Sequence, residues 1–161
     1  MGLTGVWQAI DKLQCTPTPS WIGFCYMKLL AAIPALPVSN IEQSAAFYQD
    51  KLGFEIGYQE AGFAILRRDA IEIHLWQAAD QNWRTSVVAN TSPVRSGAES
   101  FLAGTASCRI GVEGVDELCA TIEPHGLMHP NAPLKNTDYG TCEFAVLDGD
   151  GNLITFFERL G

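Results

Sequence analysis

The chain has 161 residues, 47% of them apolar, which suits one domain or two small fused modules and argues against disorder. Ten basic residues against eighteen acidic ones give a net charge of −8, so we expect cationic small molecules rather than nucleic acid as partners. No apolar stretch reaches the ~20 residues of a spanning helix, because Lys28, Pro34 and Pro37 interrupt the most apolar segment. We therefore expect no membrane partner.

The cysteines indicate a reducing compartment. They are odd in number and form no CxxC pair, so we expect free thiols and a cytoplasmic location. None is predicted to be catalytic. The five are Cys15, Cys25, Cys108, Cys119 and Cys142.

The first residues are predicted to be an extension of unknown role. Residues 1–26 place Asp11 and Lys12 ahead of the apolar run and lack a basic start, so we expect no secretory signal. The folded domain is expected over residues 27–161.

The domain opens with the apolar run AIPALPV at 32–38, which predicts a strand starting at Ile33 and Pro34. Proline cannot donate to a sheet ladder, so Pro34 and Pro37 favour an edge strand or a crossing arm over a central strand.

A helix and three strands follow. Apolar residues recur at helical spacing over 41–51, with Ser39-Asn40 as the N-cap and Gly53 as the stop. The segments FEIGYQ, GFAILRR and AIEIHLW are typical of strands. In the last of them, alternation places Glu72, His74 and Trp76 on one face. The first half is thus predicted to be βαβββ.

The second half repeats this order after a long polar connector at 77–106. CRIGVEG predicts a strand, VDELCATIEPHG a helix, and FAVLDGDGNLITFFERL a hairpin whose Asp and Gly residues form a turn rather than a calcium loop. At an offset of 74 the apolar positions of the two halves coincide, which indicates an internal repeat. The predicted fold class is α+β, with tandem modules at about 30–80 and 105–161.

Four segments carry a resemblance to a known family. Between Ile33 and Glu158, the motifs PVSNIEQSAAFYQDKLGFEIGYQE, FAILRRDAIEIHLW, VEGVDELCATIEPHG and YGTCEFAVLDGDGNLITFFE resemble the bleomycin resistance proteins of the glyoxalase and dioxygenase (vicinal oxygen chelate) superfamily. The resemblance implies two βαβββ modules with cupped mixed sheets. It also implies a strand-swapped homodimer with two ligand crevices, in which Ile33 and Pro34 belong to the exchanged arm.

The same resemblance bears on metal binding. Enzymes of this superfamily hold a divalent metal with His, Gln or Glu, and alignment to them puts Ile33, Ser107 and Thr155 on three of those positions. Ile33 offers no lone pair, and hydroxyls are weak ligands for transition metals, so we expect no metal and no cofactor. Glu72 or His74 stays open as a single surviving ligand.

The resemblance implies that the crevice binds bleomycin-type drugs, which combine a flat bithiazole with a cationic tail. Such a ligand calls for aromatic faces and carboxylates. We expect Phe63, Trp76, Trp83 and Tyr139 to supply the rings and Glu60 and Glu72 the charge, with His74 hydrogen-bonded inside the crevice.

Three functions follow as hypotheses. The first is non-catalytic binding and sequestration of a bleomycin-type glycopeptide or a similar cationic aromatic molecule. The second is a metal-dependent enzyme of the glyoxalase or fosfomycin-resistance type. The third is a crevice reshaped by the connector for an unrelated cationic or aromatic metabolite.

Overall fold

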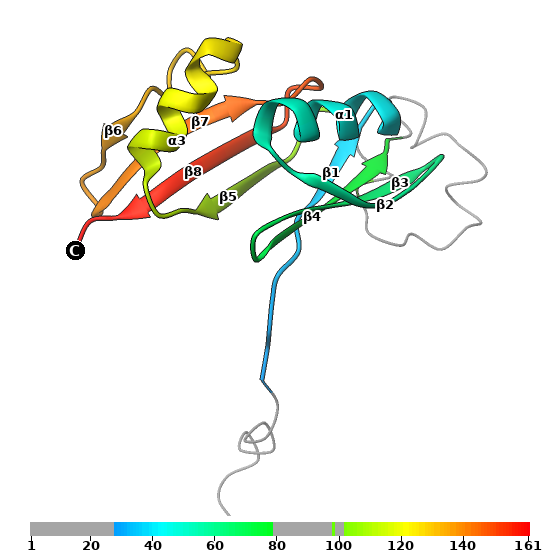
Figure 1. Cartoon of the computed structure of the whole chain (residues 1–161), viewed down its shortest axis with the longest axis horizontal. Coiled ribbons are helices and arrows are strands. Elements are labelled where there is room, and N and C mark those ends of the chain that lie inside the picture. The colour runs from blue at the N-terminus through cyan, green and yellow to red at the C-terminus, as the bar shows by residue number, and fades with distance from the viewer. Residues whose placement is uncertain (1–27, 79–97, 99–101) are drawn as a thin grey trace, which may run out of the picture. The chain divides into compact units, whose positions relative to one another are not determined.

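The computed structural model describes residues 28–78, 98 and 102–161 (Figure 1). Ala32–Gly161 form one compact unit that contains every helix and strand described below. The predicted extension at 1–26, Trp83 and most of the predicted connector lie outside the described residues. Within the described ranges, no helix is long and apolar enough to cross a membrane.

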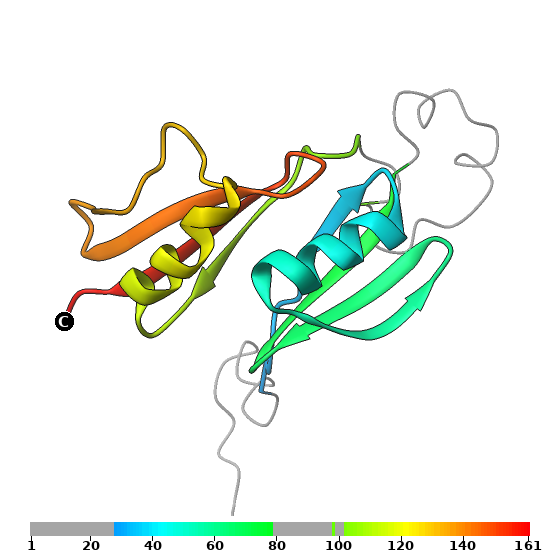
Figure 2. The ribbon, with the colours of Figure 1, turned by 45° about the horizontal axis from the view of Figure 1, so that its top comes forward.

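The first half forms the predicted βαβββ module. Its elements are β1 (Ala35–Val38), α1 (Ile41–Leu52), β2 (Glu55–Glu60), β3 (Phe63–Arg68) and β4 (Ile71–Gln77). The sheet order is β1-β4-β3-β2, with β1 parallel to β4 and the other neighbours antiparallel. Helix α1 lies across one face of this sheet (Figure 2).

The second half forms a module of the same design. Its elements are β5 (Ser107–Gly111), α3 (Val115–Ile122), the 3₁₀ turn Glu123–His125, β6 (Lys135–Asn136), β7 (Thr141–Leu147) and β8 (Leu153–Arg159). The sheet order is β5-β8-β7-β6, again with the first strand parallel to the last. The predicted α+β class and the tandem modules are therefore confirmed.

The internal repeat appears in the structure at the predicted offset. Helix α1 begins at Ile41 and α3 at Val115, which are 74 positions apart. In both modules the first strand pairs in parallel with the last. In each module a helix follows the first strand as a crossover connection, as parallel strands of one sheet require.

Helix α1 has the ends that the sequence predicts. The Asn40 side chain accepts a hydrogen bond from the Gln43 backbone N–H at 2.9 Å, which satisfies one of the free amides of the first turn. Gly53 ends the helix at φ 69°, in the left-handed region that favours glycine.

Strand β1 begins at Ala35, two residues later than predicted. The carbonyl of Pro34 still accepts from the His74 backbone N–H at 3.0 Å, but Pro34 has no N–H to return, and Ile33 is 45% exposed. The strand lies at the edge of its sheet, as its prolines predict.

Strand β4 separates a buried face from an open one. Ile73 and Leu75 are fully buried in the core, whereas Glu72, His74 and Trp76 are half-buried on the opposite face. The predicted alternation is confirmed, so the polar and aromatic side chains of this strand face away from α1.

Four phenylalanines contribute to the core. Phe54, Phe144 and Phe156 are buried, and Phe47 is half-buried and packs against the core. Phe144 and Phe156 stand opposite one another on β7 and β8, with ring centroids 5.3 Å apart. Such pairs add to the free energy gained by burying apolar area.

The predicted turn between β7 and β8 is confirmed. One oxygen of Asp148 accepts hydrogen bonds from the backbone N–H groups of Asp150, Gly151 and Asn152, at 2.8 to 3.0 Å. Gly151 adopts φ 100°. A carboxylate that accepts three amides fixes a five-residue turn.

The same turn also binds the first module. Asp150 accepts from the backbone and hydroxyl of Ser39 and from the hydroxyl of Ser44, while the Tyr48 hydroxyl donates to Asp148 at 3.0 Å. Burial, followed by the nearby Asp148 charge, raises the pKa of Tyr48 well above its ordinary value. Tyr48 therefore stays protonated as a donor.

Candidate functional site

The open face of the first sheet collects polar and aromatic side chains from β3 and β4. The antiparallel register places Arg67 opposite Glu72, and Phe63 opposite Trp76. Side chains opposite one another on the same face are in contact range, so each pair acts as one unit. His74 lies between the two pairs on β4.

The rings on this face form a connected cluster. The Phe63 ring centroid is 4.5 Å from that of Trp76, and 5.1 Å from that of His74 in an edge-on arrangement. Tyr58 from β2 lies 6.1 Å from Phe63 and is half exposed. Rings fixed by their neighbours offer stacking surface at small entropic cost.

The Trp76 indole has an unsatisfied donor. Its Nε1 is buried and has no hydrogen-bond partner among the described residues. A buried N–H without an acceptor is costly.

The carboxylate of Glu72 is held on two sides. It accepts from Arg67 Nε at 2.7 Å and from His74 Nε2 at 2.9 Å. The hydrogen bond from Arg67 is the main reason that the pKa of Glu72 is lowered, and the one from His74 adds to it. Glu72 is therefore ionised, and His74 has the hydrogen bond expected of it.

Glu60 lies at the end of β2 on the same sheet. It accepts from the Tyr58 hydroxyl at 3.1 Å, and this hydrogen bond raises the pKa of Tyr58. Glu60 also lines a cavity of about 420 Å³ together with Glu42, Gln59 and Gln77. Two carboxylates are thus among the side chains that line this cavity.

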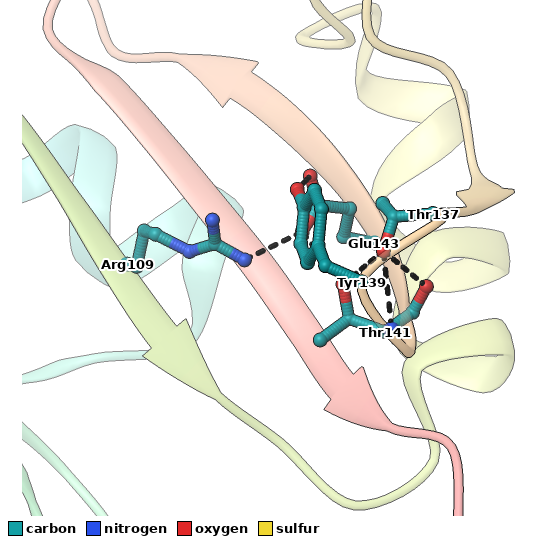
Figure 3. Close-up of polar contacts among 5 residues, drawn as sticks. All are labelled: Arg109, Thr137, Tyr139, Thr141 and Glu143. Carbon is teal, nitrogen blue, oxygen red and sulfur yellow. Dashed lines mark hydrogen bonds and ion pairs between the residues drawn. The ribbon is translucent and has the colours of Figure 1, made fainter.

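A second polar cluster lies on the open face of the other sheet (Figure 3). Arg109 reaches from β5 across β8 toward Tyr139 and Glu143, and its Nη2 lies 2.5 Å from Glu143 Oε2. The Tyr139 hydroxyl donates to Glu143 at 2.7 Å, and the Thr141 hydroxyl at 3.0 Å.

The environment of Glu143 favours its charged form. Burial alone would raise the pKa of Glu143, but the hydrogen bonds from Tyr139 and Thr141 and the charge of Arg109 outweigh it and lower the pKa. Glu143 is therefore an ionised carboxylate held by three donors.

The structure brings together five of the seven predicted site residues. Tyr139 lies in the turn between β6 and β7 of the second module, and Trp83 falls outside the described residues. The remaining five share the first sheet: Glu60, Phe63, Glu72, His74 and Trp76.

Several side chains of these clusters are not predicted from the sequence, among them Tyr58, Arg67, Arg109 and Glu143. Tyr58 and Arg67 lie in segments predicted to be strands, so a search for ring and charged side chains along these strands finds them. Arg109 and Glu143 could not be paired from the sequence, because β8 lies between their strands.

Of the positions aligned with metal ligands, Ile33 has no lone pair, and Ser107 and Thr155 carry hydroxyls, which are weak ligands. Ser107 pairs with Leu153, and Thr155 pairs with Arg109. Over the ranges the structure describes, no three His, Cys, Asp or Glu side chains come together as a metal-binding group. Glu72 contacts His74, and its other contact is Arg67, which is not a metal ligand.

A separate cavity of about 370 Å³ lies between the modules, away from these clusters. Phe54, Arg68, Ile71 and Leu118 are among its lining residues, and none of the predicted site residues lines it. We therefore place the candidate site on the open sheet faces, where rings and carboxylates meet.

Comparison with known proteins identifies the family of this chain. Residues 30–156 match the profile of the Glyoxalase/Bleomycin resistance protein/Dioxygenase superfamily. Bleomycin resistance proteins of Geobacillus stearothermophilus and Staphylococcus aureus are each 53% identical to this chain over 132 residues. The alignments cover 82% of this chain and 98% of each relative.

Solved structures agree with the profile match. The bleomycin-binding protein of Streptomyces verticillus, complexed with copper(II)-bleomycin, has a TM-score of 0.61 at 26% identity, over 84% of this chain and 98% of that chain. A bleomycin resistance determinant encoded on transposon Tn5 has a TM-score of 0.60 at 20% identity, over 81% and 98%, which shows a shared fold. The chain therefore belongs to the glyoxalase/bleomycin resistance protein/dioxygenase superfamily, and within it to the bleomycin resistance proteins.

Proposed function

We propose that the protein binds and sequesters bleomycin-type glycopeptide antibiotics, or a similar cationic aromatic molecule, without transforming them. The observation that carries this proposal is the open face of the first sheet, where stacked rings adjoin an ionised carboxylate. A flat, cationic ligand needs both features. The 53% identity to bleomycin resistance proteins supports the same ligand class.

The chemistry of the described side chains supports capture rather than catalysis. Arg67 and His74 both hydrogen-bond to Glu72, and Arg67 keeps this carboxylate ionised as a charge for a cationic ligand. Burial raises the pKa of Cys108 to about 11 and also raises the pKa of Cys119 and of Cys142. Protonated thiols are poor nucleophiles. The free thiols also fit the cytoplasmic location that we propose.

The ligand-binding form is proposed to be a homodimer. The predicted ring residues lie in both modules, with Phe63 and Trp76 on the first sheet and Tyr139 in the turn between β6 and β7 of the second module. Every residue of β2 is exposed, which leaves an uncovered sheet edge beside the ring cluster. A partner copy that contributes its arm at Ile33 and Pro34 would cover such surface and complete two equivalent crevices.

Isothermal titration with metal-free and with copper-loaded bleomycin tests this function. We expect saturable heat with at least one of the two forms. Absence of heat at protein concentrations on the order of tens of micromolar would rule out the drug as the ligand.

Metal analysis of the purified protein separates binding from the enzymatic alternative. The sequestration proposal predicts no stoichiometric Mn, Ni or Zn. A stoichiometric metal that is lost in Glu72→Ala or His74→Ala would favour an enzyme of the glyoxalase or fosfomycin-resistance type.

A further inference from the structure

The open face of the second sheet contains a cation slot that the chain fills with its own side chain. The Arg109 guanidinium carbon lies 4.9 Å from the Phe157 ring centroid and 5.8 Å from that of Tyr139. On its third side the guanidinium is bound to the carboxylate of Glu143. Two ring faces and a carboxylate are the groups that recognise organic cations.

The slot has its own support apart from Arg109. The hydroxyls of Tyr139 and Thr141 both donate to Glu143, and the Thr141 hydroxyl lies 2.8 Å from that of Thr137. The Glu143 side chain is only 15% exposed. Withdrawal of the guanidinium would therefore leave an ordered, ionised carboxylate and two available ring faces.

Arg109 can leave the slot without disturbing the core. Its side chain is 47% exposed, and Tyr139 is 64% exposed. A cavity of about 550 Å³ adjoins the slot, with Arg109, Tyr139, Thr141 and Phe157 among its lining residues. This volume lies in the range of small-molecule sites.

We propose that Arg109 is an internal competitor for the cationic group of the ligand, which takes the place of the guanidinium among Phe157, Tyr139 and Glu143. Arg109 is then a specificity-determining residue, because only cations that outcompete it gain the slot. The inference rests on the proposed function and adds a subsite to it. It assigns the cation to Glu143, a residue not predicted from the sequence, in addition to the predicted carboxylates Glu60 and Glu72.

Methylguanidinium is a suitable test ligand because it reproduces the group that fills the slot. Its affinity is measured from NMR shifts of the full-length protein at matched ionic strength. We expect Arg109→Gln to bind it roughly fivefold more tightly than the wild type. Lys51→Gln, which removes the same charge from the exposed end of α1, should bind it as the wild type does.

Glu143 provides the second half of the test. The double variant Arg109→Gln with Glu143→Gln should show none of the gain, because the slot has lost its carboxylate. Arg109→Lys keeps the charge but loses the planar fork, and we expect an affinity between those of the wild type and Arg109→Gln. It serves as the readout if Arg109→Gln fails to fold. An unchanged or weaker affinity in the folded variants, or a full gain in the double variant, overturns the inference.

Titration with metal-free bleomycin separates this inference from the proposed function. If the drug binds the wild type but Arg109→Gln does not bind methylguanidinium more tightly than the wild type, the competitor role is wrong and sequestration stands. If Arg109→Gln binds methylguanidinium more tightly as expected but no variant binds the drug, the slot is real and its natural ligand belongs to another class of cation.

Discussion

At the scale of single residues, Phe63, Trp76 and His74 form a connected ring cluster on the first sheet, which we propose as a ligand-stacking surface. Trp76 packs 4.5 Å from Phe63 at 49°, so its orientation is fixed from one side. Its buried Nε1 finds no acceptor among the described residues. Trp76 therefore combines a stacking surface with a hydrogen-bond donor.

Replacement of this ring should weaken drug binding. We expect Trp76→Ala to cost about 1–2 kcal/mol, or roughly five- to thirtyfold in the dissociation constant of bleomycin measured by titration. Trp76→Phe keeps a ring face and should retain most of the affinity. If Trp76→Phe binds as weakly as Trp76→Ala, stacking on this ring does not provide the affinity.

The pKa of Glu72 should depend on the hydrogen bond from Arg67. Its pKa lies below the ordinary value of 4.5, mainly through the Arg67 hydrogen bond. The stability that ionised Glu72 contributes is thus fully present above pH 4.5 and is lost as the pH falls through the lowered pKa.

Carbon-detected NMR of the Glu72 carboxyl group measures this directly. In Arg67→Gln the pKa of Glu72 should rise toward its ordinary value. In Arg68→Gln, whose guanidinium binds the Leu52 carbonyl instead, it should stay where it is in the wild type. An equal rise in both variants would mean that net charge, and not the hydrogen bond, sets the pKa.

The sequence predicts residues of this kind only as far as strand alternation extends. Alternation in β4 gives Glu72, His74 and Trp76 one face, because neighbours in a strand point to opposite sides. The pairing of Arg109 with Glu143 has no such local sign. The two residues are 34 positions apart and meet across an intervening strand, so only the folded sheet brings them together.

At the scale of elements, the turn between β7 and β8 holds the two modules together through buried hydrogen bonds. We expect Asp148→Ala to lower the free energy of unfolding by about 2–4 kcal/mol, because it frees three turn amides and the buried Tyr48 hydroxyl. Urea denaturation measures the loss. Asp138→Ala, an exposed aspartate with the same charge change, should stay within about 0.5 kcal/mol.

Gly104 marks the closest approach between the connector end and this turn. It adopts φ 72°, and an added Cβ would lie 2.0 Å from the Asp150 carbonyl oxygen. Gly126 has nearly the same φ, 69°, with nothing within 4 Å of an added Cβ. Gly104→Ala should therefore destabilise the fold well beyond the ~1 kcal/mol expected of Gly126→Ala. Equal losses in thermal melts would show that backbone strain alone matters at both sites.

Helices and strands are predictable here because each carries local signals. Asn40 and Gly53 mark the ends of α1, and the 74-residue offset carries the pattern into α3. Strand β1 begins two residues later than predicted because Pro34 pairs through its carbonyl alone. The hydrogen bonds of Asp150 to Ser39 and Ser44 span 111 and 106 positions, a separation at which no local pattern operates.

At the scale of the whole molecule, the proposed dimer and the net charge of −8 determine how a cationic ligand is captured. Sedimentation should give a species of twice the 17.5 kDa chain mass. One ligand per chain should then bind, since each dimer would have two equivalent crevices. A monomer that still binds the drug at full affinity would contradict the shared crevice.

The acidic surface should also speed association with cationic ligands. Added salt screens this attraction, so the association rate for bleomycin should fall between low and physiological ionic strength. Stopped-flow measurements test this. A rate that is insensitive to salt would show that the charge serves solubility alone.

The most direct measurement of capture without transformation is the fate of the drug itself. Bleomycin is incubated with a stoichiometric amount of protein, the complex is isolated and denatured, and the released drug is analysed by mass spectrometry. Capture without transformation predicts one drug molecule per chain, recovered with its mass unchanged. Recovery of a modified drug, or turnover of more than one molecule per chain, would contradict it.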